Sequence, residues 1–396
     1  MNIPKLRFKD NNGNDYPQWE KKKLGDIVQF LDNKRKPLEQ SERIHGKYPY
    51  YGASGIIDYI NNYIFDEELV LLSEDGANII DRNYPICYIA TGKYWVNNHA
   101  HVLKTKSQYL NKFLCEALER LNYNKYNTGT AQPKLNQDIC KNILLNIPIL
   151  HEQEKIANFF STIDKKIENL TNTITSLENQ KKGLLQQIFS QKLRFKDENG
   201  NNYPNWEKKK LGKLLSITSS KRVHEADWTT SGIPFYRARD IVSLFNNKPI
   251  SKIYISEKLY EECSSSCGKI SENDLLVTGV GTIGIPYLVK KSDKFYFKDG
   301  NIIWLKNSPA IYGKYLFYIF ISSYVQKQIN MMTGKGTVGT YTIKNAKDTN
   351  ILLPCLEEQT KIADFLSEFD RKLDNQKAQL EHWQQIKKGL LQQMFV

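Results

Sequence analysis

The sequence predicts an α+β protein in which two globular domains are joined by two long antiparallel coiled-coil helices, with an approximate two-fold symmetry. Three observations support this fold class: an internal repeat, two long segments with coiled-coil spacing, and short β-like runs between them. Along the chain we expect a first domain at 1–148, a long helix at 149–192, a second domain at 193–353 and a second long helix at 354–396.

Three pairs of matching segments reveal the internal duplication. They lie at 6–25 and 193–212, at 147–167 and 353–373, and at 181–189 and 387–395. The first pair, LRFKDNNGNDYPQWEKKKLG and LRFKDENGNNYPNWEKKKLG, differs at three of twenty positions. The intervening stretches, about 26–146 and 213–352, hardly resemble each other. A duplicated frame with two divergent inserts indicates one task performed twice on two different objects.

Two long segments carry the apolar spacing of coiled-coil helices. Apolar residues recur at alternating steps of three and four positions for more than four heptads. The predicted seam consists of Ile156, Phe160, Ile163, Ile167, Leu170, Ile174 and Leu177 in the first helix and Ile362, Leu366, Phe369, Leu373, Leu380 and Trp383 in the second. Lys181, Gln376 and Lys387 are polar positions within this spacing. Gly183 and Gly389 indicate either a close helix crossing or a fraying helix end.

We expect the two helices to pair with each other in antiparallel orientation. The second domain connects the end of the first helix to the start of the second, and antiparallel pairing brings these two ends together. Parallel pairing would require that domain to bridge most of the length of the helices. Two alternatives stay open: each helix packs on its own domain, or the seam drives homodimerisation.

The composition favours a folded, basic protein with a polyanionic partner. The chain of 396 residues is 40% hydrophobic and carries a net charge of +13, which suits DNA, RNA or an anionic membrane surface. No apolar run approaches the roughly 18 residues of a membrane span. The N-terminus lacks the apolar core of a signal peptide, so we expect a cytoplasmic protein without a membrane partner. The six cysteines lack zinc-ligand spacing and are expected to be reduced thiols.

In the first variable stretch, residues 90–103 (ATGKYWVNNHAHVL) concentrate groups suited to nucleic acid. Amide and imidazole side chains can contact base edges, and lysine can hold phosphate. His99 and His101 are spaced for one face of a strand, but no Cys or carboxylate at ligand spacing accompanies them, so we predict no metal site. A Gly/Thr/Lys loop at 127–136 is typical either of contacts to the DNA backbone or of a solvated connector. The predicted DNA-contact residues of this domain are Tyr51, Ser54, Lys93, Tyr94, Asn97, Asn98, His99 and Lys134.

The second variable stretch aligns weakly with the first. YPYYGASGI at 48–56 corresponds to IPFYRARDI at 233–241, with different residues at the tips. Arg237 and Arg239 alternate with Ala238, so on an extended strand both would point to one side. Arginine suits bidentate contact with guanine O6 and N7, and a surface pair or a phosphate clamp is the alternative. The predicted DNA-contact residues here are Tyr236, Arg237, Arg239, Thr282, Lys335, Thr337 and Tyr341.

The motifs of common enzymes are either incomplete or missing. GVGTIG at 279–284 and GKGTVG at 334–339 fit GxGxxG, but the segments that follow look extended rather than helical. Neither run continues into GK[ST], and the chain has no HExxH, no GxSxG and no methyltransferase tetrad. We therefore expect a non-catalytic chain without a cofactor of its own.

The alternation of variable and shared segments resembles the specificity (HsdS) subunit of Type I restriction–modification systems. The resemblance covers essentially the whole chain. It is carried by the repeated QxKIAxFxSxxDxKI and KKGLLQQ signatures, by the YYGASGIIDYI and TGKYWVNNHAHVL runs, and by GTAQPKLN before the first long helix.

The resemblance implies that each variable region is a target-recognition domain for one half of a bipartite DNA site, and that the paired helices act as a ruler. It further implies that two methyltransferase subunits dock on the helices and that restriction/translocase subunits join them. S-adenosylmethionine would then be bound by the methyltransferase subunits. Two other classes remain as alternatives, a basic coiled-coil scaffold without specific DNA recognition and a nucleotide-binding enzyme that uses the glycine loops.

Overall fold

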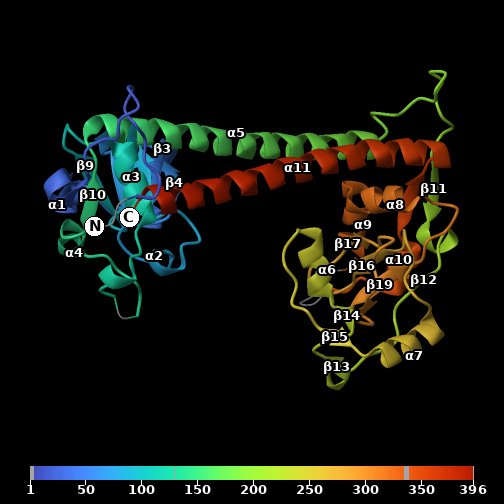
Figure 1. Cartoon of the computed structure of the whole chain (residues 1–396). Helices are drawn as coiled ribbons and strands as arrows, with labels where there is room; N and C mark the ends of the chain where they lie inside the picture. The colour runs from blue at the N-terminus through green and yellow to red at the C-terminus, as the bar shows by residue number, and fades with distance from the viewer. Residues whose placement is uncertain (1–3, 130, 334–338, 396) are drawn as a thin grey trace. The chain divides into compact units, whose positions relative to one another are not determined.

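The computed structural model describes residues 4–129, 131–333 and 339–395, and Figure 1 shows the course of the chain. Its contacts divide it into two compact units. Unit 1 comprises Met1–Asn172 and Lys377–Val396, and unit 2 comprises Thr173–Gln376. Each unit therefore holds one of the two variable stretches together with a part of each long helix.

Unit 1 contains two four-stranded sheets. The first has the order β2-β9-β6-β7 and is antiparallel, whereas the second has the order β4-β3-β8-β5 and pairs β3 with β8 in parallel. The elements are β1 Glu20–Lys23, α1 Leu24–Ile27, β2 Val28–Phe30, β3 His45–Gly52, β4 Gly55–Ile60, β5 Phe65–Asp66, β6 Leu69–Ser73, α2 Asn78–Asp81, β7 Cys87–Ala90, β8 Lys93–Val96, β9 Ala100–Thr105, α3 Asn111–Arg120, α4 Gln137–Lys141 and β10 Leu144–Ile147. Every residue of β6 is buried, because β6 lies between two strands and packs against α3.

Unit 2 repeats this plan with shorter strands. Its sheets have the orders β12-β19-β16-β17 and β13-β15-β14-β18, and β14 pairs with β18 in parallel as β3 pairs with β8. The elements are β11 Glu207–Lys210, β12 Ile217–Thr218, β13 Trp228–Thr229, β14 Ile233–Tyr236, α6 Ala238–Phe245, β15 Tyr254–Ile255, α7 Glu257–Cys267, β16 Leu275–Thr278, β17 Pro286–Leu288, β18 Tyr296–Phe297, β19 Ile302–Leu305, α8 Gly313–Ile321, α9 Ser323–Met332, α10 Ile343–Asp348 and β20 Asn350–Leu353. The predicted α+β class is confirmed in both units.

The shared segments form the same polar junction in each unit. In unit 1 the buried carboxylate of Glu152 accepts hydrogen bonds from Arg7 Nη2 at 2.7 Å and from Trp19 Nε1 at 3.0 Å. In unit 2 Glu358 accepts from Arg194 Nη2 and from the Trp206 indole, each at 2.8 Å. A buried carboxylate requires such partners. In both units the repeated LRFKD and WEKKK segments therefore bind the first turn of a long helix.

The long helices are α5 (Leu150–Phe189) and α11 (Leu356–Met394). In unit 1 one apolar cluster joins the first turns of α5 to the last turns of α11, and in unit 2 another joins the last turns of α5 to the first turns of α11. The predicted antiparallel orientation is thus confirmed within each unit. Of the predicted seam residues, eight are buried: Ile156, Phe160, Ile163, Leu170, Ile174, Ile362, Leu366 and Leu373. The remaining five are half-buried: Ile167, Leu177, Phe369, Leu380 and Trp383.

The ends of the helices also belong to the cores of the two units. Phe160 lies 6.0 Å from Phe395 between ring centroids, and both rings pack in the cluster that contains Phe113 of α3. The helices therefore pair with each other and also pack on the globular part of each unit at their ends. Within each unit the apolar seam residues are covered by residues of the same chain.

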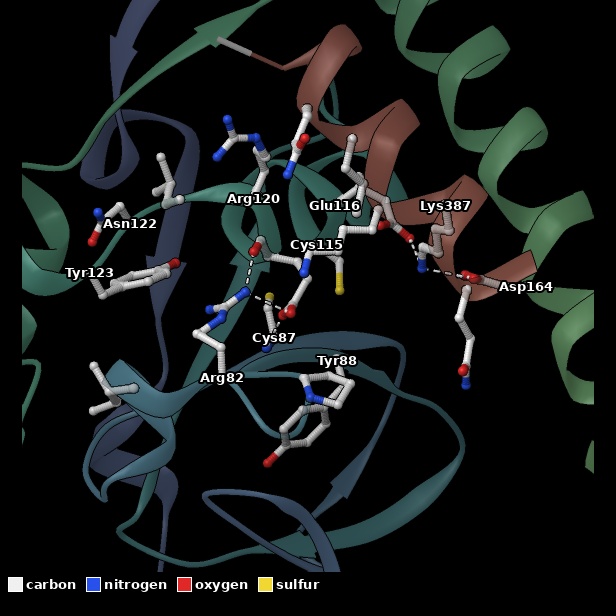
Figure 2. Close-up of a pocket in the computed structure, with 18 of the residues that line it drawn as sticks. Arg82, Cys87, Tyr88, Cys115, Glu116, Arg120, Asn122, Tyr123, Asp164 and Lys387 are labelled. Carbon is white, nitrogen blue, oxygen red and sulfur yellow. Dashed lines mark hydrogen bonds and ion pairs between the residues drawn. The ribbon is translucent and has the colours of Figure 1, made fainter. Parts of the chain in front are cut away.

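Ion pairs explain two of the three polar positions of the seam. In unit 1 Lys387 Nζ lies 2.7 Å from Asp164 Oδ1 and 3.0 Å from Glu116 Oε1 (Figure 2). In unit 2 Lys181 Nζ forms an ion pair with Asp370. Each lysine of one helix thus pairs with an aspartate of the other. None of the helices within the described part of the chain is long and apolar enough to cross a membrane.

Candidate nucleic-acid interface

In unit 1 a turn and two loops meet at the ends of β3, β6 and β8. Ser54 is exposed in the two-residue turn between β3 and β4. The Ser73 hydroxyl, at the end of β6, donates a hydrogen bond to the carbonyl of Ala53 and fastens this turn to the loop that follows β6. Asn98 is exposed in the loop between β8 and β9. The structure therefore brings together two predicted contact residues that are far apart in sequence.

His99 and Lys134 lie at the same place, where each contacts an acidic residue that the sequence analysis missed. His99 Nδ1 lies 2.8 Å from Asp75 Oδ2, and Lys134 Nζ lies 3.4 Å from Glu74 Oε1. The His99 side chain is 49% exposed and that of Lys134 is 46% exposed, so both present polar atoms outward. We call Ser54, Asp75, Asn98, His99 and Lys134 the first corner. Its hydroxyl, amide, imidazole and ammonium groups suit contacts with base edges and phosphate.

A buried ion pair supports the first corner from below. His101 Nδ1 lies 2.7 Å from Asp32 Oδ2, and its Nε2 lies 2.7 Å from the Leu135 carbonyl oxygen. Burial disfavours the charged ring, but the contributions of Asp32 and Cys140 together outweigh burial and raise the pKa of His101 to about 10. Arg35 adds bonds to the Glu74 carboxylate at 2.6 Å and to the Ala100 carbonyl at 2.8 Å. No motif marks Asp32 or Arg35, because His101, Glu74 and Ala100, which they contact, are distant in sequence.

The structure corrects three predicted contacts, because their side chains have almost no exposed surface. Tyr94 is fully buried and its ring stacks on Phe65 at 5.5 Å. Asn97 is 4% exposed, and its side-chain oxygen accepts a hydrogen bond from the His99 backbone N–H at 2.8 Å. Tyr341 is 1% exposed and its hydroxyl lies 2.6 Å from Thr349 Oγ1. These side chains pack or bond within their own unit and present almost no surface to a ligand.

Two further predicted residues of unit 1 lie outside the first corner. Tyr51 is half-buried and stacks on Tyr88 with ring centroids 5.7 Å apart. Lys93 is exposed, but its ammonium lies 4.7 Å from the centroid of Tyr63 and 3.8 Å from Asp66. DNA contact by Lys93 remains a prediction.

In unit 2 the predicted arginine strand is wrong. Helix α6 begins at Ala238, so Arg237 and Arg239 do not alternate along an extended segment. Arg237 precedes the helix, and its Nε donates to Asp240 at 2.8 Å while its Nη2 donates to Ser251 Oγ at 2.6 Å. Its side chain is only 12% exposed, so it serves the helix start. Arg239 is exposed on α6 and remains a candidate contact.

Equivalent backbone bonds locate a second corner in unit 2. The Glu74 N–H donates to the His99 carbonyl in unit 1, and the Gly279 N–H donates to the Asn301 carbonyl in unit 2. A second pair of bonds is also equivalent. The Leu135 N–H donates to the Glu74 carbonyl in unit 1, and the Tyr341 N–H donates to the Gly279 carbonyl in unit 2. The loop after β16 and the loop between β18 and β19 therefore correspond to the two loops of the first corner.

In the second corner Asn301 holds the position of His99, and an exposed arginine comes from the loop after β12. Arg222 Nε lies 3.0 Å from Asp299 Oδ2, and the Arg222 side chain is 71% exposed. A hollow of about 330 Å³ beside it is lined by Arg222, Val223, His224, Glu225, Lys298, Asp299, Gly300 and Asn301. Sequence reasoning missed Arg222 and Lys298, because the weak alignment of the two variable stretches did not extend to them.

The other predicted DNA-contact residues of unit 2 are Thr282, Tyr236, Lys335 and Thr337. Thr282 is exposed in the loop between β16 and β17. Tyr236 is half-buried and stacks on Phe295 at 4.4 Å. Lys335 and Thr337 lie outside the described residues.

The glycine run at 279–284 leads into strand β17, so no helix follows it as a dinucleotide site requires. The second run, at 334–339, lies almost entirely outside the described residues. Among the residues placed by the structure, no three His, Cys, Asp or Glu side chains group as metal ligands.

A family model described as the Type I restriction modification DNA specificity domain matches residues 16–179 and 203–382. The chain belongs to this family. It is a DNA specificity subunit of a Type I restriction–modification system, a non-catalytic component with two target-recognition domains. The two matched segments begin within the two copies of the repeated LRFKD frame, so the family's domain occurs twice in the chain.

Curated relatives and solved structures agree with this assignment. A putative type I restriction enzyme specificity subunit of Haemophilus influenzae is 31% identical over 356 residues, which cover 89% of this chain and 87% of that protein. The MjaVIII specificity subunit of Methanocaldococcus jannaschii is 25% identical, covering 97% of this chain and 94% of that protein. The fold is similar to the crystal structure of the Type I S subunit from M. genitalium, with a TM-score of 0.63 and 18% identity over 99% of both chains.

Proposed function

We propose that the two target-recognition domains, at 1–148 and 193–353, each contact one half of a bipartite and asymmetric DNA site. One observation carries this proposal. The same backbone corner occurs in both units, but its exposed side chains differ: His99 beside Asp75 in unit 1, and Arg222 beside Asp299 in unit 2. Imidazole and guanidinium groups match different base edges, so the two half-sites should differ in sequence.

The repeated frame supports a second part of the proposal. Two methyltransferase subunits dock on the helical segments at 149–192 and 354–396, and restriction/translocase subunits join them. Near-identical segments in both halves of the chain suit two copies of one partner. S-adenosylmethionine binds to the methyltransferase subunits, and the assembly acts in the cytoplasm. The paired helices set the gap between the half-sites.

Co-expression of this chain with its methyltransferase subunit, followed by mapping of methylated adenines, tests the proposal. The expected result is a gapped, asymmetric motif that disappears when this chain is omitted. Methylation that is unchanged without the chain would contradict it and would favour a scaffold role. DNA binding measured at rising salt gives a second test, because a specific complex keeps its preferred sequence while the nonspecific phosphate contribution fades.

A further inference from the structure

The edge strand β4 of unit 1 presents two consecutive isoleucines on its surface. In the register of β3 and β4, Tyr51 pairs with Ile56. The next pair is Tyr50 with Asp58, so Ile57 is the extra residue of a β-bulge. Ile56 is 45% exposed and Ile57 is 49% exposed, although a regular strand directs neighbouring side chains to opposite faces. Bulges redirect side chains at sheet edges, and this one accompanies two consecutive large apolar side chains at the surface.

The isoleucine pair adjoins the first corner on two sides. Ile56 lies two residues after Ser54, which is exposed in the turn of that corner. Ile57 packs over Gly52, since a Cβ atom added to this glycine would lie 3.2 Å from both Cδ1 and Cγ2 of Ile57. The same Cβ atom would lie 3.3 Å from Asn97 Nδ2, and Asn97 begins the loop between β8 and β9. The apolar pair is therefore continuous with the turn and the loop that form the first corner.

The strand at the same place in unit 2 carries no such pair. In unit 1 the chain leaves β3 through a short turn into β4, whereas in unit 2 it leaves β14 into helix α6. The neighbour of β14 at the position of β4 is β15, in which Tyr254 is half-buried and Ile255 is buried. The exposed isoleucines are therefore a property of the first target-recognition domain and not of the shared fold.

The chemistry of the major groove explains why apolar and polar groups would stand side by side in such a domain. The hydroxyl, amide and imidazole groups of the first corner suit the donors and acceptors of base edges, but they do not suit a methyl group. The 5-methyl group of thymine is the apolar feature that a base pair presents in the major groove, and apolar side chains contact it. An amide beside an aliphatic side chain thus matches an A·T pair, with the amide on adenine and the aliphatic group on thymine.

We propose that Ile56 and Ile57 contact the 5-methyl group of a thymine in the half-site of the first domain, the first half-site. The pair covers the methyl group and excludes water from it, which favours thymine over a base without this methyl group. The inference rests on the proposed function and deepens it, because it names a chemical group that the first domain recognises.

Replacement of single thymines by deoxyuridine tests the contact from the side of the DNA, because it removes only the 5-methyl group. The probe is a duplex that contains the site mapped by methylation, and it is titrated with the co-expressed complex of this chain and its methyltransferase subunit. One replacement in the first half-site should weaken binding by about three- to tenfold, as expected when a buried methyl group is lost. If the complex keeps its preferred sequence and no replacement in the first half-site weakens binding, the inference alone is overturned. A complex without a preferred sequence would contradict the proposed function as well.

Substitution of the isoleucines tests the contact from the side of the protein. The double variant Ile56→Ser/Ile57→Ser should bind the thymine and deoxyuridine duplexes equally, because the two losses concern one contact and do not add. Its preference in the other half-site should be unchanged, which shows that the chain is folded. Ile44→Ser is the matched control and should keep the thymine preference, since Ile44 is 66% exposed and lies at the end of the hairpin opposite the turn.

Two outcomes of this substitution would overturn the inference. The first is a thymine preference that the double variant Ile56→Ser/Ile57→Ser retains in full. The second is weaker assembly with the methyltransferase subunit together with an unchanged thymine preference, because the isoleucine pair would then contact a protein and not DNA.

Discussion

The two target-recognition units share a frame but differ in the charges that they bury. Beneath the first corner, His101 on β9 pairs with Leu72 of the central strand and holds Asp32. In unit 2 the matching position on β19 is Ile303, which pairs with Val277. The strands pair in the same way in unit 2 without the His101–Asp32 ion pair. The fold therefore does not require this buried charge, which instead supports the loops of unit 1.

A second difference lies where each domain meets the helices. Lys387 has two carboxylate partners in unit 1, Asp164 and Glu116, whereas Lys181 in unit 2 has Asp370, which also accepts a hydrogen bond from Tyr318 at 2.6 Å. The lysine and the aspartate come from the repeated helices. The third group comes from the variable stretch, and it is acidic in one domain and phenolic in the other.

The largest loss of stability should come from breaking the buried glutamate junction that both units share. We expect Glu152→Ala and Glu358→Ala each to lower the free energy of unfolding of its own unit by about 2–4 kcal/mol, because a half-buried arginine and a tryptophan N–H lose their shared carboxylate. Denaturant unfolding measures the loss, and Glu154→Ala, at a side chain 47% exposed, is the control and should cost less than about 1 kcal/mol. A large loss in only one unit would show that the two junctions are not equivalent.

The buried ion pair should make unit 1 sensitive to alkaline pH. The pKa of His101 is raised to about 10 from an ordinary value near 6.5, so its stabilising contribution is complete below pH 6.5 and is lost as pH rises toward 10. Each unit of pKa shift corresponds to about 1.4 kcal/mol, which makes a loss of a few kcal/mol the upper expectation. Unfolding at pH 6, 8 and 10 measures it.

His101→Gln supplies the comparison for that experiment. This variant should be less stable than the wild type at pH 6, and the difference should shrink toward pH 10. Unit 2 has Ile303 at the matching position and should contribute nothing to the pH-dependent difference. A difference that stays constant across this range would mean that His101 is neutral in the folded protein.

Changes at the two corners should alter sequence preference without changing the fold. We expect His99→Ala to relax preference in the first half-site only and Arg222→Ala in the second only, each by about 1–3 kcal/mol where a base contact is lost. Arg237→Ala is the control within unit 2, because its bonds to Asp240 and Ser251 predict lower stability with unchanged preference. Binding to half-site variants distinguishes these results, and a uniform loss for Arg222→Ala would make it a phosphate contact.

The sequence predicted the parts of the molecule that depend on periodicity or repetition. The seam from Ile156 to Leu177 follows directly from helical spacing, and antiparallel pairing follows from the connection between the helices. The two corners were harder to predict from the sequence, because Asp75 and Asp299 contact residues of other loops that lie far away along the chain. Arg237 was misjudged because an alternating pattern of three residues cannot distinguish a strand from a helix start that uses Asp240. Tyr94 was misjudged because aromatic residues suit both DNA contacts and cores.

The smallest expected effect concerns Gly183 in α5 and Gly389 in α11. A Cβ atom at either position would meet nothing within 4 Å, which removes the close-crossing explanation among the described residues. Gly183→Ala and Gly389→Ala should therefore each stabilise the isolated chain by about 0.5–1 kcal/mol, since alanine favours the helix. Thermal unfolding measures this gain, and the exposed change Lys182→Ala should have almost no effect. A variant that is more stable alone but assembles poorly with its methyltransferase subunit would show that the open space beside these glycines is occupied by the partner.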